Sequence, residues 1–311
     1  GKLYLPYSNG DEVEQNESIV EMIKDGWNVP NRIPFASELK VEDGAPITSI
    51  ITSGAKGTVK YYKLIGDYLE RREDIKAGDT VSDKGVFAVI GSYTSGATEA
   101  AQTTYFRSKV LQTSDGTSDS LISNKYWTFF RNSFPNSSQS DFTAEYMVNS
   151  KKYKNIVVLS DYSSYSEGLG DATAASIKAL GGNVIYRGKI KSGTQNFTAM
   201  LTKVKSMNPD VIYYSGYYTD GGLLRAQQAQ LQIDADFVGG DSNDNPDFYK
   251  LAGASAEGSV LINFPTPEIL PYPEAKKYLA AYKTKFQMDP PSIWSVTNAD
   301  GLRAVIEGIE K

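Results

Sequence analysis

Residues 156–187 read IVVLSDYSSYSEGLGDATAASIKALGGNVIYR, and this stretch decides the fold. Its first residues, 156–159, are an uninterrupted apolar run of strand length. From 166 to 180 the apolar residues return with helical spacing, and Gly181-Gly182 ends that helix because glycine accepts a left-handed cap. A second strand-like run follows at 183–187. Strand, helix and strand joined by short connections predict a parallel βαβ unit.

The same alternation continues in both directions along the chain. Strands are predicted at 86–91, 109–113, 154–160, 183–187, 210–215, 236–239 and 259–263. Helices are predicted at 97–108, 138–150, 166–180, 197–207, 220–231, 273–287 and 296–310. We therefore expect an α/β fold with parallel, doubly wound sheets, whose ligands bind beyond the carboxyl ends of the strands.

The stretch before residue 86 has a different texture. Stretches rich in β-branched and aromatic residues, such as 57–64, are separated by turn signals such as Glu42-Asp43-Gly44-Ala45-Pro46. One helix is predicted around 17–24, with Asp25-Gly26 as its stop. The sequence thus predicts a small, mostly-β, barrel-like segment over 1–85 ahead of the α/β region.

The composition of the 311 residues excludes several chemistries. The chain has neither histidine nor cysteine, so disulfides, thiolate nucleophiles, His-dependent triads and metal sites with His or Cys ligands are impossible. A net charge of −5 with mixed signs gives no basic field for nucleic acid. We therefore expect a binding protein, not an enzyme, with no catalytic residues, metal or cofactor.

A hydroxyl-rich turn follows the strand that ends at Ile90. Thr94 and Ser95 stand where the next helix starts, and the N–H groups of that helix start would complete a seat for a carboxylate. The alternative is an ordinary helix N-cap. The next strand end carries Asp115 and Thr117, again with hydroxyls and carbonyls.

Tyrosines stand in two later strand-end loops. Tyr165 lies just before the predicted helix 166–180, and Tyr217 follows the strand 210–215. They would form aromatic walls of a site, or simply pack with their hydroxyls in water.

The loop 239–247 offers an acidic side chain, Asp241, after another strand. Its Asp/Asn alternation is similar to a calcium-binding EF-hand loop, but Pro246 replaces the required glycine and Ala252 the terminal glutamate. A Gly-Asp-Ser hydrolase motif would need a histidine. What remains is a carboxylate suited to a ligand ammonium, or a plain Asn/Asp turn.

Taken in order, these loops resemble the solute-binding proteins of ABC importers, specifically the branched-chain amino-acid (Leu/Ile/Val) type. The pieces that carry the resemblance are Val89–Gly96, Tyr165–Leu169, Asn208–Ile212, Ser215–Tyr218, Gly239–Asp241 and Ala254–Gly258. The resemblance implies a type I periplasmic-binding-protein fold over 86–311. Its first lobe would comprise about 86–137 and 262–311, and its second lobe about 138–261.

The resemblance also implies the ligand contacts. Ser95 and Thr117, with Thr94 in the same turn as Ser95, would hold an α-carboxylate. The Asp115 carbonyl and the Asp241 carboxylate would receive the α-ammonium. Tyr165 and Tyr217 would close over the ligand, and Trp294 would border its side chain.

Residues 1–90 resemble another protein. Gly26–Ala36, Lys40–Pro46 and Gly66–Arg71 are similar to a β-rich stretch of the bacterial RNA polymerase β′ subunit, and both resemblances include Phe87-Ala88-Val89-Ile90, as a fusion or chimera would. The βαβα segment with a Pro-Leu-Thr-Gly-like loop that opens the binding-protein family is not found before Val86. The competing interpretation is a permuted binding protein in which 1–70 supply strands that usually end the chain.

The leading hypothesis is therefore a periplasmic or extracellular protein, lipid-anchored in its precursor form, that clamps a small amino acid between two lobes. It would act as a monomer, deliver its ligand to an ABC permease, and bind no nucleic acid through 86–311. The alternative is a non-transport interaction module made of the polymerase-like segment and an incomplete binding-protein lobe. A carboxylate-based hydrolase is a third interpretation, for which no loop pairs two acids.

Overall fold

The chain divides into two compact units. In the computed structural model, residues 2–6, 28–29, 31–32, 49–53, 58–65, 68–76, 86–290 and 292–309 are described. Unit 1 comprises Gly1–Ser133 and Pro265–Lys311, and unit 2 comprises Phe134–Phe264. The rings of Phe134 and Phe264, at the two ends of unit 2, lie 3.9 Å apart between centroids. Their contact holds the entry and the exit of unit 2 together.

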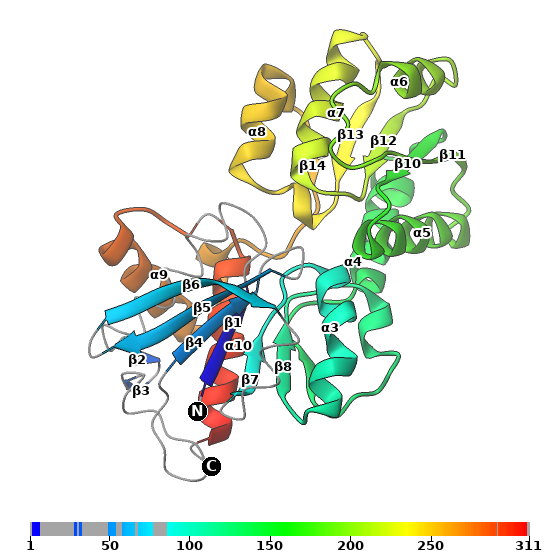
Figure 1. The fold of residues 1–311 in the computed structure, drawn as a ribbon. Helices are drawn as coiled ribbons and strands as arrows, with labels where there is room; N and C mark the ends of the chain where they lie inside the picture. The colour runs from blue at the N-terminus through cyan, green and yellow to red at the C-terminus, as the bar shows by residue number, and fades with distance from the viewer. Residues whose placement is uncertain are drawn as a thin grey trace. The chain divides into compact units, whose positions relative to one another are not determined.

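Unit 2 contains a five-stranded sheet in which every neighbouring pair is parallel (Figure 1). The strands, in spatial order, are β11 (Val184–Lys189), β10 (Ile156–Ser160), β12 (Val211–Tyr214), β13 (Asp236–Gly239) and β14 (Val260–Leu261). The helices are α4 (Asn136–Glu145), continued by a π-helical turn (Tyr146–Ser150), α5 (Ser164–Ala179), α6 (Thr198–Lys205), α7 (Tyr218–Gln230) and α8 (Pro246–Ala252). Short 3-10 turns cover Asp241–Asn243 and Gly253–Ala256.

Both faces of this sheet are buried, which explains why its strands read as continuous apolar runs. Val157 and Leu159 of β10 belong to one hydrophobic cluster, with side chains of α6, α7 and α8. Ile156 and Val158 belong to another, with Ala144 of α4 and side chains of the π-helical turn and α5. Parallel strands connected by crossover helices have this double cover.

The strand order of unit 2 places its topological switch point between β10 and β12. The chain leaves β10 towards β11 on one side and then returns to β12 on the other. In open α/β sheets the loops at such a point splay apart at the carboxyl ends of the strands, where ligands bind. Tyr165 follows β10 and Tyr217 follows β12, so both belong to the loops of the switch point.

Unit 1 contains a seven-stranded mixed sheet. Its strands, in spatial order, are β6 (Tyr68–Lys76), β5 (Thr58–Ile65), β4 (Ser49–Ser53), β1 (Lys2–Pro6), β7 (Val86–Ile90), β8 (Leu111–Ser114) and β9 (Phe129–Arg131). Pairing is parallel from β4 to β9 and antiparallel from β4 to β6. The remaining elements are β2 (Asn28–Val29), β3 (Asn31–Arg32), α3 (Ser95–Arg107), α9 (Pro273–Phe286), α10 (Trp294–Ile309) and two 3-10 turns (Asp119–Ile122, Pro267–Ile269).

Helix α10 approaches the centre of this sheet closely. A Cβ atom at Gly301 would stand 2.9 Å from Thr113 Oγ1 and 3.5 Å from Ile90 Cγ2, so α10 requires a residue without a side chain at this point. The contact brings the carboxyl-terminal part of the chain onto β7 and β8. The last helix therefore completes the unit that the first strands begin.

The described strands of the segment before Val86 run in the same sheet. β1 pairs in parallel with both β4 and β7, so the mostly-β segment is continuous with the α/β sheet of unit 1. Most other residues of the predicted barrel-like segment over 1–85, including the helix predicted at 17–24, lie outside the described residues. The sequence analysis predicted a second lobe over about 138–261, and the observed unit 2 comprises Phe134–Phe264.

The predicted elements from 86 onward correspond to observed ones, with shifts of a few residues at their ends. The sequence prediction omitted β9, a three-residue strand whose first residue follows Trp127-Thr128. Within the described ranges, none of the helices combines the length and the apolar character needed to cross a bilayer.

Leu159→Ala tests the buried sheet of unit 2. Leu159 is fully buried in β10, so the variant should lower the free energy of unfolding by about 2–5 kcal/mol through lost burial and a residual cavity. The matched control is Leu180→Ala, because Leu180 is 37% exposed and should cost under about 1 kcal/mol. Urea unfolding followed by circular dichroism measures both, and equal losses would contradict the doubly covered sheet.

Candidate functional site

The hydroxyl-rich turn of unit 1 caps helix α3. Thr94 is the N-cap residue, and its Oγ1 accepts a hydrogen bond from the Ala97 N–H at 3.3 Å. The cap residue has extended backbone angles, which turn the chain from β7 into the helix. The helix start and its hydroxyls therefore present donors beyond the carboxyl end of β7, which is a suitable arrangement for an anion.

Ser95 links this turn to the loop after β8. Its side chain is almost fully buried, and its Oγ accepts a hydrogen bond from the Ser118 N–H at 3.1 Å. Thr117, which precedes Ser118, is also buried. The structure thus brings the Thr94-Ser95 turn and the Thr117 loop together at the ends of two adjacent parallel strands.

A second set of hydrogen bonds, from the side chains of Thr98 and Ser114, fixes the same two loops. The hydroxyls of Thr98 and Ser114 both donate to the Ser92 carbonyl at 2.7 Å, and Ser114 Oγ also accepts from the Gly116 N–H at 3.0 Å. A Cβ atom at Gly116 would stand 2.6 Å from Leu121 Cδ1 and 3.3 Å from Ser95 Cα. The loop is therefore held in one conformation, and Gly116 is required by close approach.

Arg131 is a site residue that the sequence prediction missed. It ends β9, and its Nη1 donates to the Ser118 carbonyl at 3.0 Å and to the Thr117 carbonyl at 3.4 Å. The guanidinium brings a positive charge to the loop that carries Thr117. Its position could have been found only by predicting β9, the strand that it ends, and the sequence analysis did not predict that strand.

Asp115 directs its side chain towards helix α10. Asn298 Nδ2 donates to Asp115 Oδ2 at 2.6 Å and to the Trp294 carbonyl at 2.9 Å. Burial raises the pKa of Asp115 to about 7, while hydrogen bonds from Thr297 and Asn132 act in the opposite direction and the charge of Asp300 raises it further. The carboxyl group thus joins the loop to α10, and the predicted ligand contact of Asp115 is its backbone carbonyl.

Trp294 opens α10 next to the hydroxyl-rich turn. Its ring meets the ring of Tyr93 edge to face, with centroids 5.5 Å apart and an interplanar angle of 86°. Trp294 is buried. Of the predicted residues, Thr94, Ser95, Asp115, Thr117 and Trp294 therefore belong to one connected set in unit 1.

Asp241 is the centre of the corresponding set in unit 2. It follows β13 and is 1% exposed. Tyr165 Oη donates to Asp241 Oδ1 at 2.5 Å, and Gln139 Nε2 donates to the same oxygen at 2.7 Å. The carboxylate is therefore buried yet supplied with two donors on one oxygen.

Burial and hydrogen bonding act against each other at this carboxylate. Burial raises the pKa of Asp241, and the bonds from Tyr165 and Gln139 lower it. Burial also raises the pKa of Tyr165, and the neighbouring Asp241 charge adds to this effect. Tyr165 is consequently a neutral phenol whose hydroxyl donates a hydrogen bond to Asp241.

Tyr165 and Tyr217 form an aromatic pair from two different loops. Their ring centroids lie 5.2 Å apart at an angle of 44°. Tyr217 is the N-cap residue of α7 and is half-buried. Of the predicted residues, Tyr165, Tyr217 and Asp241 therefore lie in unit 2, where Tyr165 contacts the other two.

Gln139 of α4 was not identified from the sequence. It is buried, and besides donating to Asp241 Oδ1 its Oε1 accepts from the Asp241 N–H at 3.2 Å. A Cβ atom at Gly240 would stand 3.0 Å from Gln139 Oε1 and 3.3 Å from Tyr165 Oη, so this contact depends on glycine at 240. A polar residue within a predicted helix gives no sign that it faces an acid about 100 positions later.

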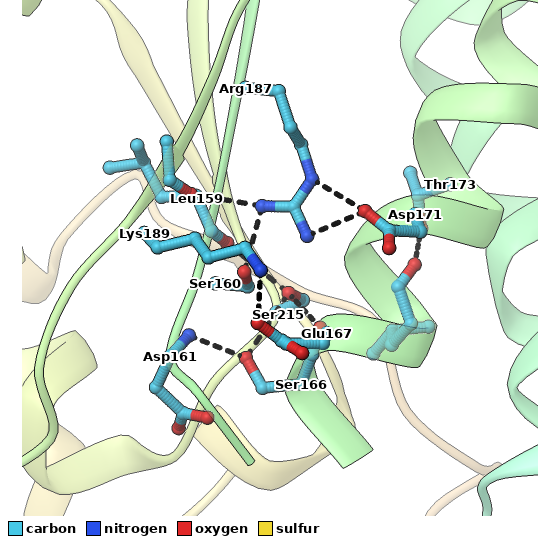
Figure 2. Close-up of polar contacts among 12 residues, drawn as sticks. Leu159, Ser160, Asp161, Ser166, Glu167, Asp171, Thr173, Arg187, Lys189 and Ser215 are labelled. Atoms are coloured by element: carbon cyan, nitrogen blue, oxygen red, sulfur yellow. Dashed lines mark hydrogen bonds and ion pairs between the residues drawn. The ribbon is translucent and has the colours of Figure 1, made fainter. Parts of the chain in front are cut away.

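A polar network anchors the start of α5 (Figure 2). Tyr165 lies in the first turn of this helix. Ser163 caps α5 by accepting from the Ser166 N–H, and Ser166 Oγ accepts from the Asp161 N–H at 2.8 Å. Ser215 Oγ donates to the Ser166 carbonyl at 2.8 Å, so the loop after β12 is tied to the same turn.

Charged side chains of β11 hold α5 from its other side. Arg187 Nη1 donates to Ser160 Oγ at 2.7 Å, and its Nε donates to Asp171 Oδ1 at 3.0 Å. Lys189 forms an ion pair with Glu167 in the first turn of α5 (Figure 2). Helix α5 is therefore fixed against β10 and β11 at the end that carries Tyr165.

Comparison with known proteins identifies the class. Residues 73–311 match the family of periplasmic binding proteins, and the chain belongs to this family. The leucine-binding protein LivK of Thermotoga maritima is similar in structure, with a TM-score of 0.80, 23% identity, and coverage of 99% of this chain and 82% of that one. The confirmed fold is the type I periplasmic-binding-protein fold.

A second solved structure has the same fold. It is LivJ of Streptococcus pneumoniae, a branched-chain amino-acid transporter substrate-binding protein in complex with isoleucine. The TM-score is 0.77 and the identity 23%, with 98% of this chain and 82% of that chain covered. The family match confirms the predicted periplasmic binding protein, and the two structures confirm the predicted likeness in fold to proteins of the Leu/Ile/Val type.

The amino-terminal segment is similar to a different protein. The β′ subunit of DNA-directed RNA polymerase from Aliarcobacter butzleri is 80% identical over 90 residues, which are 29% of this chain and 6% of that subunit. The corresponding subunit from a Nitratiruptor species is 57% identical over 115 residues, 37% of this chain and 8% of that subunit. The predicted polymerase resemblance is confirmed, and this chain spans well under a tenth of the subunit.

Asp115→Asn tests the buried carboxyl of unit 1. With a folded pKa of about 7, above its ordinary value, the charge of Asp115 costs stability that builds up as the pH rises from about 4 and is fully present above pH 7. The amide variant should therefore be more stable than the parent by about 2 kcal/mol or more at pH 8, and the gain should shrink as the pH falls and vanish near pH 4. Thermal unfolding across this pH range measures it.

The control for this prediction is Asp234→Asn. Asp234 is exposed, so its replacement should change the unfolding temperature of the protein little. A gain of Asp115→Asn that is the same at pH 5 and pH 8 would contradict the assignment of a neutralised, buried carboxyl.

Proposed function

We propose that this protein binds a small amino acid and delivers it to an ABC permease. The observation that carries the proposal is the opposite chemistry of the two connected sets. Unit 1 presents hydroxyls, a helix start and Arg131, which suit an anion, whereas unit 2 presents the buried carboxylate of Asp241. A free amino acid carries one group of each sign.

The α-carboxylate would bind to the set in unit 1. Ser95 and Thr117 stand in loops that the bond from the Ser118 N–H to Ser95 Oγ already joins, so both loops are held before a ligand arrives. The helix start at Thr94 and the charge of Arg131 would stabilise the anion further. Such preorganisation reduces the entropy lost on binding.

The α-ammonium would bind to Asp241 and to the Asp115 carbonyl. Tyr165 and Gln139 both donate to Oδ1 of Asp241, an arrangement in which Oδ2 would accept from the ligand. A charge-assisted hydrogen bond to a buried carboxylate is a strong one. Tyr165, Tyr217 and Trp294 would supply aromatic contacts for the rest of the ligand, as is common in small-molecule sites.

Similar proteins support the class of ligand. LivK is described as a leucine-binding protein, and the LivJ structure contains isoleucine. By analogy, this chain would function as a monomer in the periplasm or outside the cell, with a lipid anchor on its precursor and a membrane permease as its partner.

A second candidate function rests on the amino-terminal identity. The 80% identity over 90 residues to an RNA polymerase subunit favours an interaction module, in which the polymerase-like segment binds a protein partner and no amino acid is carried. This alternative predicts no response of the protein to amino acids.

Calorimetric titration with a panel of the twenty amino acids separates the two functions. A ligand at 100 times its dissociation constant should stabilise the protein by about 2.7 kcal/mol, visible also as a rise in the unfolding temperature. Absence of heat and of thermal stabilisation across the whole panel would reject the amino-acid receptor and favour the interaction module.

Asp241→Asn tests the ammonium assignment. Removing the charge while keeping the shape should weaken binding of a free amino acid roughly 100-fold, since a buried ammonium would lose its counter-charge. The matched control is Asp220→Asn, an aspartate of equal burial in α7 that is not assigned to the ligand. Dissociation constants from calorimetry decide the matter, and equal effects of both variants would refute the role of Asp241.

A further inference from the structure

Gln139 contacts the candidate ligand carboxylate at two points. Its Nε2 donates to Asp241 Oδ1 at 2.7 Å, and its Oε1 accepts from the Asp241 N–H at 3.2 Å. One side chain amide thus binds the side chain and the backbone of the same residue. Such a reciprocal pair restricts both the position of the loop after β13 and the rotation of the carboxylate.

We propose that Gln139 is a positioning residue, which orients the Asp241 carboxylate and keeps it ionised for a ligand ammonium. The inference rests on the proposed amino-acid-binding function for its ligand, but the contacts with Asp241 exist without one. Gln139 itself would not touch the ligand.

The surroundings of Gln139 are rigid, as a positioning role requires. Gln139 lies in α4, which packs on α5, and Ser176 Oγ of α5 donates to Asp141 Oδ1 at 2.6 Å. Asn136 Nδ2 of α4 also donates to the Tyr165 carbonyl at 3.1 Å. Helix α4 therefore holds both partners of the carboxylate, Gln139 directly and Tyr165 through its backbone.

The two donors to Asp241 Oδ1 are not equivalent. Tyr165 is a phenol, whose proton can be shared with the acid, whereas the amide of Gln139 cannot give up its proton. An amide donor therefore stabilises the ionised carboxylate more than the protonated acid. Removing it leaves the buried carboxylate with Tyr165 as its one side-chain donor, so the equilibrium shifts towards the protonated form of Asp241.

Two titratable groups face Asp241 from the neighbouring elements. They are the phenols of Tyr165 on α5 and Tyr213 on β12, both buried. Burial, together with the charge of Asp241, raises the pKa of each phenol above its ordinary value. Neither phenol changes its charge between pH 5 and 8, so a change of affinity in this range would report on Asp241.

Gln139→Met is the variant that tests the proposal, because it keeps the length of the side chain and removes both hydrogen bonds. The matched control is Gln228→Met. Gln228 is a glutamine of similar burial in α7, and its Nε2 donates to the Ala235 carbonyl at 2.6 Å. Both variants lose a buried amide, but only one loses a contact with Asp241.

The first measurement is the dissociation constant of an amino acid that the parent protein binds, by calorimetry from pH 5 to pH 8. Gln139→Met should weaken binding roughly tenfold at pH 8, as loss of a hydrogen bond to a charged group does. The loss should grow at lower pH, because Asp241 protonates earlier. Gln228→Met should keep the affinity and the pH profile of the parent.

The second measurement needs no ligand and separates this proposal from the proposed function. Burial already raises the pKa of Asp241, so its charge destabilises the fold at high pH, and the penalty is relieved as the pH falls. Gln139→Met increases this penalty. Its unfolding temperature should therefore fall further below that of the parent at pH 8 than at pH 5, while the deficit of Gln228→Met should be constant.

The outcomes are distinguishable. If the parent binds no amino acid, the proposed function fails, and the ligand-free pH dependence alone decides the role of Gln139. If Gln139→Met and Gln228→Met lose stability equally at every pH, Gln139 is an ordinary packing residue and the proposal is overturned. The proposal is also overturned if the parent binds an amino acid and Gln139→Met binds it with the same affinity.

A second variant covers the case in which Gln139→Met does not fold. Gln139→Glu keeps the shape and places two carboxyl groups in contact, which cannot both ionise without a large penalty. Its unfolding temperature should fall steeply between pH 5 and pH 8 relative to the parent. A parallel pH dependence of parent and variant would overturn the proposal.

Discussion

The constraint on which both units depend is the parallel sheet. A parallel strand can follow its neighbour only through a crossover, so every strand of unit 2 ends at the same edge and every helix returns over a face. Burying both faces removes polar side chains from the strands, and the polar residues gather in the loops at the carboxyl edge. Tyr165, Tyr217 and Asp241 are near one another for this reason.

Two buried aspartates show how the fold manages charge after a strand. Burial raises the pKa of both. Asp115 accepts from the amide of Asn298 and joins its loop to α10, whereas Asp241 accepts from Tyr165 and Gln139 on one oxygen. The first carboxyl serves the architecture of unit 1. The second is arranged so that its cost of burial is offset by donors, which is the condition for keeping an anion within a site.

The strand Val86–Ile90 is where two relationships of the chain meet. It lies within the family match of 73–311, and the polymerase-like sequence covers about the first 90 residues of the chain. A central strand tolerates this because it requires only a short apolar run, and β7 pairs with β1 on one side and with β8 on the other. The described strands of the first 76 residues consequently extend the sheet of unit 1, although their sequence is similar to an unrelated protein.

The sequence by itself determined the elements from 86 onward, the parallel α/β class and the strand-end loops, because apolar runs and helical spacing are local and strong. It missed β9, whose three residues are too short for a pattern, and with it the contact of Arg131 with the Thr117 loop. Only the tertiary structure decided that Gln139 reaches Asp241 and that Asn298 reaches Asp115, at separations of 102 and 183 residues. Helix packing sets such contacts, and no spacing along the chain encodes them.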